Sequence, residues 1–144
     1  MIIDSIKDGD PEKLAILDKR CFEIPWSQKS FEDELKNDMA HYFIAREGDE
    51  IIGYAGFCNV SGEGDITNIA VDEKYRRKHI GSALLEALIK KAAALKLELL
   101  TLEVRRSNIA AQRLYAKYGF EEIGIRKGYY SNNREDALIM TKTL

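Results

Sequence analysis

The feature that most constrains the fold is a change of pattern after residue 75, where helix and strand signals begin to alternate. Residues 62–75 are β-branched and alternating in their middle, which predicts a strand. Residues 81–96 space their apolar side chains every three or four positions, as an amphipathic helix does. A strand expected at 97–104 and a helix at 107–119 continue the series. This succession favours parallel pairing of strands in the middle of the chain.

The rest of the chain predicts antiparallel strands and two more helices. We expect strands at 1–6, 41–47, 50–60, 120–130 and 134–144, and helices within 8–22 and 24–37. The second and third of these strands surround a short turn and predict a hairpin. The expected fold class is therefore α/β: a single domain over residues 1–144, with about four helices and a mixed sheet that is mostly antiparallel.

Helix ends and strand burial give finer expectations. Asp10, Ser27 and either Ser107 or Asn108 are placed to cap the N-termini of three helices. Gly119 follows the last predicted helix, where glycine commonly ends one. The strand at 97–104 has a dense apolar run, which predicts burial on both of its faces.

Composition excludes several classes of protein. The 144 residues carry a formal net charge of −2 with both signs interspersed, which argues against general nucleic-acid binding. Two cysteines, Cys21 and Cys58, lack the spacing of a metal site and are expected to be buried apolar fillers. We see no signal peptide and no apolar run long enough for a membrane span. A cytoplasmic protein without membrane contact is expected.

A local cluster of cations precedes the helix at 81–96. The stretch RRKHIGS, residues 76–82, joins three cations, a histidine and a glycine to a helix start. Helix N-termini attract phosphate through unpaired N–H groups and the helix dipole, and cationic side chains add to this. The stretch lacks both the Gly-Lys-Ser/Thr of a phosphate-binding loop and the three glycines of a dinucleotide fingerprint. Taken alone, it fits a solvated basic loop equally well.

Longer motifs show a family resemblance. NIAVDEKYRRKHIGSALLEAL, residues 68–88, resembles the acetyl-CoA-binding motif of the GNAT N-acetyltransferases, and LEVRRSNIAAQRLYAKYGF, residues 102–120, resembles their second motif. With IPWS at 24–27 and RKGYYSNNREDALIM at 126–140, the chain is most similar to the bacterial ribosomal-protein-alanine N-acetyltransferases. The resemblance covers nearly the whole chain in family order. It implies a central parallel strand pair splayed around acetyl-CoA.

The resemblance also implies a reaction and its partners. The acetyl group of acetyl-CoA would pass directly, without a metal, to the N-terminal alanine of small-subunit ribosomal protein number eighteen. Acetylation of a small amine or antibiotic, or acyl-CoA binding without turnover, stays open as an alternative. The chain is expected to be a monomer or weak dimer.

Binding of acetyl-CoA is assigned by the resemblance to one strand, one loop and one helix. Its expected contacts are Ile69, Ala70, Val71, Arg76, Arg77, Lys78, His79, Ile80, Gly81, Ser82, Asn108 and Tyr115. His79 stands where the family motif normally has glycine. Because family loops bind the pyrophosphate through backbone N–H groups, we interpret His79 as an accommodated substitution at a positive φ rather than as a catalytic residue.

Two residues are the candidates for proton transfer. Glu103 lies on the opposite strand face from Leu102 and Val104 and should be partly desolvated, as suits a general base. The alternative is an exposed glutamate paired with Arg105 or Arg106. The resemblance makes Tyr115 the acid that protonates the leaving thiolate, while a tyrosine of the core is the alternative.

Three aromatic residues are expected at the acceptor. Trp26 lies between the first two predicted helices, and Tyr129 and Tyr130 lie between the last two strands. In related N-terminal acetyltransferases these two loops flank the acceptor peptide. For Trp26 the alternative is that it staples the second helix to the core.

Overall fold

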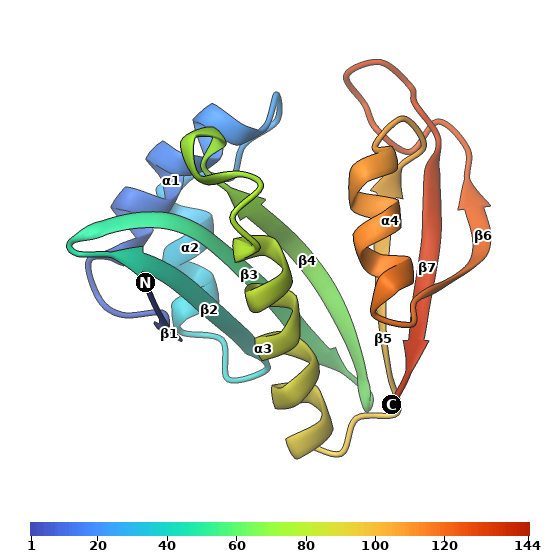
Figure 1. Cartoon of the computed structure of the whole chain (residues 1–144), viewed down its shortest axis with the longest axis horizontal. Coiled ribbons are helices and arrows are strands. Elements are labelled where there is room, and N and C mark those ends of the chain that lie inside the picture. The colour runs from blue at the N-terminus through green and yellow to red at the C-terminus, as the bar shows by residue number, and fades with distance from the viewer.

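A seven-stranded sheet forms the centre of the computed structural model, which describes residues 1–144 (Figure 1). Its strand order is β1-β2-β3-β4-β5-β7-β6. The strands are β1 (Ile2–Ser5), β2 (Ala40–Glu47), β3 (Glu50–Val60), β4 (Glu63–Val71), β5 (Leu99–Arg105), β6 (Glu121–Arg126) and β7 (Ala137–Thr143). The helices are α1 (Asp10–Cys21), α2 (Gln28–Leu35), the 3₁₀ turn η1 (Glu73–Tyr75), α3 (Ile80–Ala94) and α4 (Ile109–Lys117). The predicted α/β class, element order and four α-helices are confirmed.

The sheet divides between β4 and β5. These two strands pair in parallel, as predicted, but only from Glu63↔Leu99 to Asp65↔Thr101. A β-bulge follows in β4, because Gly56 of β3 faces Asn68 while the next residue, Phe57, faces Ile66. Beyond the bulge the strands diverge, so that the sheet opens like a V (Figure 1). All other neighbours are antiparallel, and β7 lies between β5 and β6.

The half of the sheet formed by β1 to β4 is covered on both faces. One face packs on α3 through Leu84, Leu85 and Leu88, which are fully buried. The other packs on α1 and α2, whose Leu14, Leu17 and Phe31 are also fully buried. Fully burying side chains of this size stabilises a fold by about 1.5–3 kcal/mol each. This half is thus the rigid frame of the molecule.

The other half, β5-β7-β6, has a helix on one face only. Strand β5 alternates: Leu100, Leu102 and Val104 are buried, whereas Leu99, Thr101 and Glu103 are partly exposed. The expected burial of this strand on both faces is therefore wrong, because helices cover only one face of this part of the sheet (Figure 1). The uncovered face of β5 is free to line a cavity.

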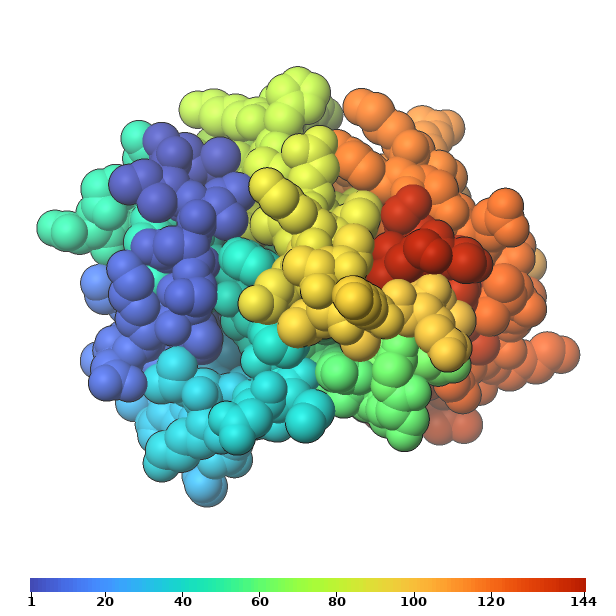
Figure 2. All heavy atoms as spheres, turned by 90° about the horizontal axis from the view of Figure 1, so that it is seen from below, coloured from blue at the N-terminus to red at the C-terminus, as the bar shows by residue number.

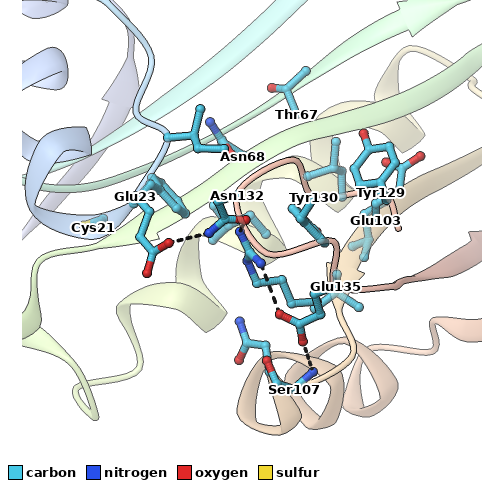
Figure 3. A pocket seen from close by; sticks show the side chains of 18 of the residues that line it. Cys21, Glu23, Thr67, Asn68, Glu103, Ser107, Tyr129, Tyr130, Asn132 and Glu135 are labelled. Atoms are coloured by element: carbon cyan, nitrogen blue, oxygen red, sulfur yellow. Dashed lines mark hydrogen bonds and ion pairs between the residues drawn. The ribbon is translucent and has the colours of Figure 1, made fainter. Parts of the chain in front are cut away.

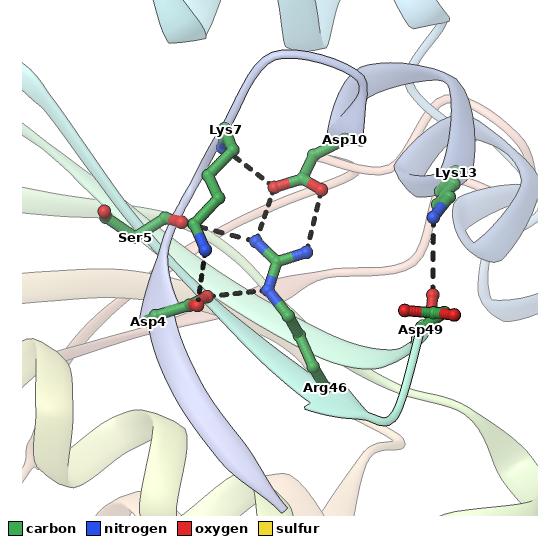
Figure 4. A network of polar contacts seen from close by, with 7 residues as sticks. All are labelled: Asp4, Ser5, Lys7, Asp10, Lys13, Arg46 and Asp49. Atoms are coloured by element: carbon green, nitrogen blue, oxygen red, sulfur yellow. Dashed lines mark hydrogen bonds and ion pairs between the residues drawn. The ribbon is translucent and has the colours of Figure 1, made fainter.

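Two of the three predicted helix N-caps are confirmed. Ser27 Oγ accepts from the N–H of Ser30, and Asn108 Oδ1 from the N–H of Ala111, so both are N-caps. Asp10 is the first residue of α1 rather than its cap, and the N-cap is Gly9. Its carboxylate instead binds Arg46 of β2 through both oxygens, at 2.8 and 2.6 Å (Figure 4).

At the closed end of the sheet the C-terminus packs beside the turn that joins α3 to β5 (Figure 2). The N–H of Leu144 donates to the carbonyl of Glu98 at 3.0 Å, and that of Glu98 to the carbonyl of Gly62 at 2.9 Å. These bonds hold β4 and β5 together where they pair, so the opening lies at the other end of the V. No helix has the length and apolar character to cross a membrane.

The two cysteines are less buried than expected. Cys21 and Cys58 are both partly exposed, and both are free thiols. The Cys21 thiol donates to the carbonyl of Val71 at 3.6 Å, and the Cys58 thiol to Glu34 at the same distance. Burial raises the pKa of each thiol, which makes both poor nucleophiles.

Candidate active site

Two cavities meet where β4 and β5 separate. The first, of about 620 Å³, lies among β4, β5, the α1–α2 loop and the β6–β7 loop, and we call it the loop cavity. The second, of about 580 Å³, lies at the start of α3, and we call it the helix cavity. Both are lined by Cys21, Phe22, Ile69, Asn108 and Tyr115. A molecule in one cavity can therefore reach a molecule in the other at this shared wall.

The helix cavity contains a helix start without a side-chain cap. His79 is the residue before α3, with φ 61° and ψ 21°, and its side chain makes no capping hydrogen bond. This is the left-handed conformation that favours glycine and was expected of this residue. The N–H groups of Ile80, Gly81 and Ser82 therefore find no side-chain partner, unlike those of α2 and α4. Such a start is suited to binding an anion.

Gly81 leaves room above this helix start. A Cβ at this position would meet only Leu114 Cδ2 at 3.6 Å and Val71 Cγ2 at 3.9 Å, both ordinary contacts. Packing of the chain thus does not itself require glycine, and the bare backbone is open to a ligand. Arg76 and Arg77 also line the cavity, whereas Lys78 does not, and its ammonium lies 5.4 Å from the centre of the Tyr75 ring.

Backbone groups of β4 also line the opening. The N–H of Asp72 donates to the carbonyl of Ile52 in β3 at 2.8 Å. Hydrogen-bonded positions alternate along an antiparallel strand, so residues 70 and 68 of β4 also bond to β3. Ile69 and Val71 alternate with them and direct their N–H and C=O groups towards the gap. Of the three β4 residues expected to contact acetyl-CoA, Ala70 thus has its backbone turned to β3.

Tyr115 occupies the wall between the cavities. It projects from α4, is only 9% exposed, and packs its ring 5.8 Å from that of Phe120. Burial, with a smaller contribution from Tyr130, raises the pKa of Tyr115 to about 12, so that the hydroxyl is protonated at neutral pH. Tyr115 is a tyrosine of the core, as the alternative expected, and it also faces both cavities. Its role as the acid stays a prediction.

Glu103 lines the loop cavity on the uncovered face of β5. Its side chain is 21% exposed, which confirms partial desolvation, and its Oε1 accepts from Arg126 Nε at 3.1 Å. The alternative pairing with Arg105 or Arg106 is wrong. These two arginines pair with Glu135 at 3.1 Å and Asp136 at 3.4 Å.

A polar cluster fixes the β6–β7 loop, and sequence reasoning missed it. Arg105 donates to Glu135 and, at 3.0 Å, to Asn132, and its guanidinium lies 3.9 Å from the ring centre of Tyr130 (Figure 3). The Ser107 N–H donates to Glu135 at 2.7 Å. Bonds from Ser107, more than the nearby Arg105, lower the pKa of Glu135 to about 2. No local motif predicts this cluster, because its members lie some 30 residues apart in the sequence.

The α1–α2 loop forms the opposite rim. Trp26 packs its ring 5.4 Å from that of Phe31 in α2, as the alternative expected, and it also lines the loop cavity. Its backbone N–H donates at 2.7 Å to the fully buried Asp18, which also accepts from the Tyr54 hydroxyl. Burial raises the pKa of Asp18. Tyr129 and Tyr130 line the same cavity from the facing loop.

An opened parallel strand pair, an uncapped helix start on one side and a buried tyrosine between two cavities together define an acyltransferase of the N-acetyltransferase class. The sequence model of the Acetyltransferase (GNAT) family matches residues 12–120, and the chain belongs to this family.

Relatives and solved structures agree with this assignment. A Bacillus subtilis protein, named provisionally as a ribosomal protein bS18-alanine N-acetyltransferase, is 40% identical over 94% of this chain and 90% of its own. The Escherichia coli K12 ribosomal protein bS18-alanine N-acetyltransferase is 36% identical over 96% and 94%. The crystal structure of the Escherichia coli enzyme superimposes with a TM-score of 0.90 at 35% identity, over 99% of this chain and 92% of that one. An acetyl-CoA-bound GNAT acetyltransferase from Elizabethkingia anophelis gives 0.78 at 25% identity, over 99% and 97%.

Proposed function

We propose that this chain transfers the acetyl group of acetyl-CoA directly to the N-terminal α-amine of a protein, the N-terminal alanine of ribosomal protein bS18. The observation that carries the proposal is the meeting of two cavities at Tyr115, with Glu103 lining one and the start of α3 lining the other. The acceptor follows from the names of relatives that match almost the whole chain.

The helix cavity takes acetyl-CoA. The first N–H groups of α3 bind its pyrophosphate, which can approach closely because Gly81 has no side chain. Arg76 and Arg77 add positive charge beside it. Asn108, already the cap of α4, faces the pantetheine arm. The backbone of Ile69 and Val71 polarises the thioester carbonyl, as an oxyanion hole does.

Glu103 acts on the amine. A terminal α-amine has a pKa near 7.7–8.0, so a modest base is enough to leave it neutral at pH 7. Its lone pair attacks the carbonyl carbon, a C–N bond forms, and Glu103 takes the proton that the nitrogen loses, directly or through water. The ion pair with Arg126, at 3.1 Å, holds the Glu103 carboxylate in place on the cavity wall.

Tyr115 acts on the leaving group. Collapse of the tetrahedral intermediate breaks the C–S bond, and Tyr115 donates a proton to the departing sulfur. One proton leaves nitrogen and one reaches sulfur, so amide and free thiol are formed in balance. A pKa of about 12 keeps Tyr115 protonated but makes it a weak acid, so its hydrogen bond to the developing thiolate carries much of the effect.

The acceptor chain lies between the two loops that flank the loop cavity. Trp26 and its loop are fixed by Asp18 on one side, and Tyr130 is held against Arg105 on the other. Tyr129, half exposed, stands at the rim. Three aromatic rings around a cavity suit the backbone and apolar groups of a short extended peptide.

Mass spectrometry of acetyl transfer tests the proposal. The panel holds a peptide that copies the bS18 N-terminus, the same peptide with its α-amine blocked, and a polyamine. One acetyl group on the free peptide alone supports the proposal. Acetylation of only the polyamine would move the chain to small-amine acetylation, and acetyl-CoA binding without any product would indicate a binding module.

A double variant separates an enzyme from a binding module by a second route. Glu103→Gln with Tyr115→Phe should abolish turnover while acetyl-CoA still binds, because neither residue holds the pyrophosphate. A binding module would lose nothing. Acetyl-CoA affinity is read by isothermal titration, and turnover by release of free thiol.

A further inference from the structure

One charged residue of the loop cavity has no partner of opposite sign. Four charged side chains line this cavity: three carboxylates and one guanidinium. Glu103 pairs with Arg126 and Glu135 with Arg105. Glu23 forms no ion pair, although it stands at the rim between α1 and α2. The lining therefore carries more negative than positive charge, and one of its carboxylates has no cationic partner.

Glu23 instead accepts a hydrogen bond from a neutral amide. Asn132 of the β6–β7 loop donates its side-chain N–H to Glu23 across the cavity, and its Oδ1 accepts from Arg105 at 3.0 Å (Figure 3). No other side-chain hydrogen bond joins the α1–α2 loop to the β6–β7 loop. The Asn132 amide carries no charge, so an ammonium or guanidinium would add an ionic attraction that the present hydrogen bond lacks and would compete with the amide for Glu23.

We propose that Glu23 selects acceptors with a cationic side chain close behind the acetylated residue. The inference rests on the proposed function, because it takes the loop cavity as the acceptor site. Glu103 is committed to the α-amine and Glu135 to the backbone of Ser107, which leaves Glu23 to meet a second positive charge. The negative excess of the cavity lining also draws cationic chains towards it.

Peptides that differ in one charge test the inference. Three peptides with a free N-terminal alanine carry arginine, neutral citrulline or glutamate at the second and third positions, and kcat/KM is measured for each. The unchanged chain should prefer arginine over citrulline about fivefold, the size expected of a partly exposed ion pair. Glu23→Gln should bring the two peptides to equal kcat/KM, and Glu23→Lys should make the glutamate peptide the preferred acceptor.

Glu12→Gln is the matched control, because Glu12 is an exposed residue of α1 that lies outside both cavities. It removes the same charge and should keep the arginine preference. Melting temperature and acetyl-CoA affinity confirm that each variant folds.

Each result either supports the inference or overturns it. Equal kcat/KM for arginine and citrulline in the unchanged chain, or a preference that survives Glu23→Gln, overturns it and leaves the proposed function standing. If the unchanged chain acetylates no free peptide, the proposed function and the inference fall together. Reversal of the preference by Glu23→Lys is the strongest support, because a structural role for Glu23 would not produce it.

Discussion

The helix cavity and the loop cavity share a wall but are built from different parts of the chain. Around the start of α3, most groups that face the ligand belong to the main chain: the first N–H groups of the helix, a glycine without a side chain and the backbone of β4, with Arg76 and Arg77 beside them. Around the loops they are side chains, several of which are held by a partner from another element. Backbone donors tolerate a change of residue type, whereas paired side chains do not.

This difference explains how His79 can stand where the family motif has glycine. Any residue except proline offers an N–H, and the fold needs only that φ stays positive at this position. The loop cavity tolerates fewer substitutions, because the Arg105 guanidinium packs on the Tyr130 ring and is itself held by its ion pair with Glu135. We therefore expect variants of the helix cavity to be mild and variants of the loop cavity and its shared wall to be severe.

The largest effect is expected at the shared wall. Tyr115→Phe removes the proton donor and should lower kcat by about 10²–10³-fold, within the range of general acid catalysis. The ring keeps its contact with Phe120, so the melting temperature and acetyl-CoA affinity should hardly change. Steady-state kinetics with the bS18 peptide measures the loss.

Tyr118→Phe is the control for this variant. Tyr118 is the C-cap residue of the same helix, but its hydroxyl donates to Glu86, away from both cavities. It should keep nearly full activity. An equal loss in both variants would mean that α4 needs its tyrosine hydroxyls for structure rather than for chemistry.

A smaller effect is expected at the anchor of the loop cavity. Arg105→Met keeps the length of the side chain but releases Glu135, Asn132 and Tyr130. Charged hydrogen bonds of this kind contribute about 1.5–3 kcal/mol, so KM for the acceptor peptide should rise about tenfold or more. Affinity for acetyl-CoA should stay unchanged, because Arg105 lies outside the helix cavity.

Arg106→Met provides the comparison, since Arg106 pairs only with Asp136 at 3.4 Å and is mostly exposed. Arg106→Met should leave KM for the acceptor peptide and the dissociation constant of acetyl-CoA near their original values. A rise in the acetyl-CoA dissociation constant in Arg105→Met would contradict the separation of the two cavities.

The two cavities also differ in how far the sequence reveals them. The elements of the helix cavity follow from local patterns: a strand, a basic loop with Gly81, and an amphipathic helix. The resemblance to known motifs then supplies Glu103 and Tyr115, and the structure brings both to the cavities. These signals lie within runs of about twenty residues, which is why sequence reasoning finds them.

The anchors of the loop cavity escape such reasoning because they join distant segments. Glu23 meets Asn132 across 109 positions, and Arg105 meets Glu135 across 30. Asp18 looks like any polar residue of an amphipathic helix, and only the fold shows it buried under Trp26. The wrong expectation for β5 has the same origin, since an apolar run does not tell which face a helix will cover.

Acid should weaken the loop anchor in a defined pH window. The pKa of Glu135 is about 2, below its ordinary value of 4.5, so its contribution to stability is complete above pH 4.5 and is lost as the pH falls towards 2. The melting temperature of Glu135→Gln should therefore lie below that of the unchanged chain by a constant amount from pH 7 to 5. The gap should then shrink at lower pH.

Scanning calorimetry from pH 7 to 2.5 measures this gap. Glu121→Gln, at an exposed residue of β6 without an ion pair, removes one carboxylate of the same kind and is the control. A gap for Glu135→Gln that stays the same from pH 5 to 2.5 would mean that Glu135 is not charged in the fold as its hydrogen bonds require.

The smallest effect is expected at His79. A left-handed conformation disfavours residues other than glycine by about 1 kcal/mol, so His79→Gly should raise the free energy of unfolding by up to that amount. Acetyl-CoA affinity should stay within about threefold, because the N–H groups remain in place.

Lys96→Gly, at φ 60° beyond the far end of α3, should give the same gain in stability with no effect on binding. Denaturation curves and isothermal titration of both variants measure this. A tenfold loss of affinity in His79→Gly alone would show that the imidazole binds the cosubstrate, and the helix cavity would then depend on side chains as the loop cavity does.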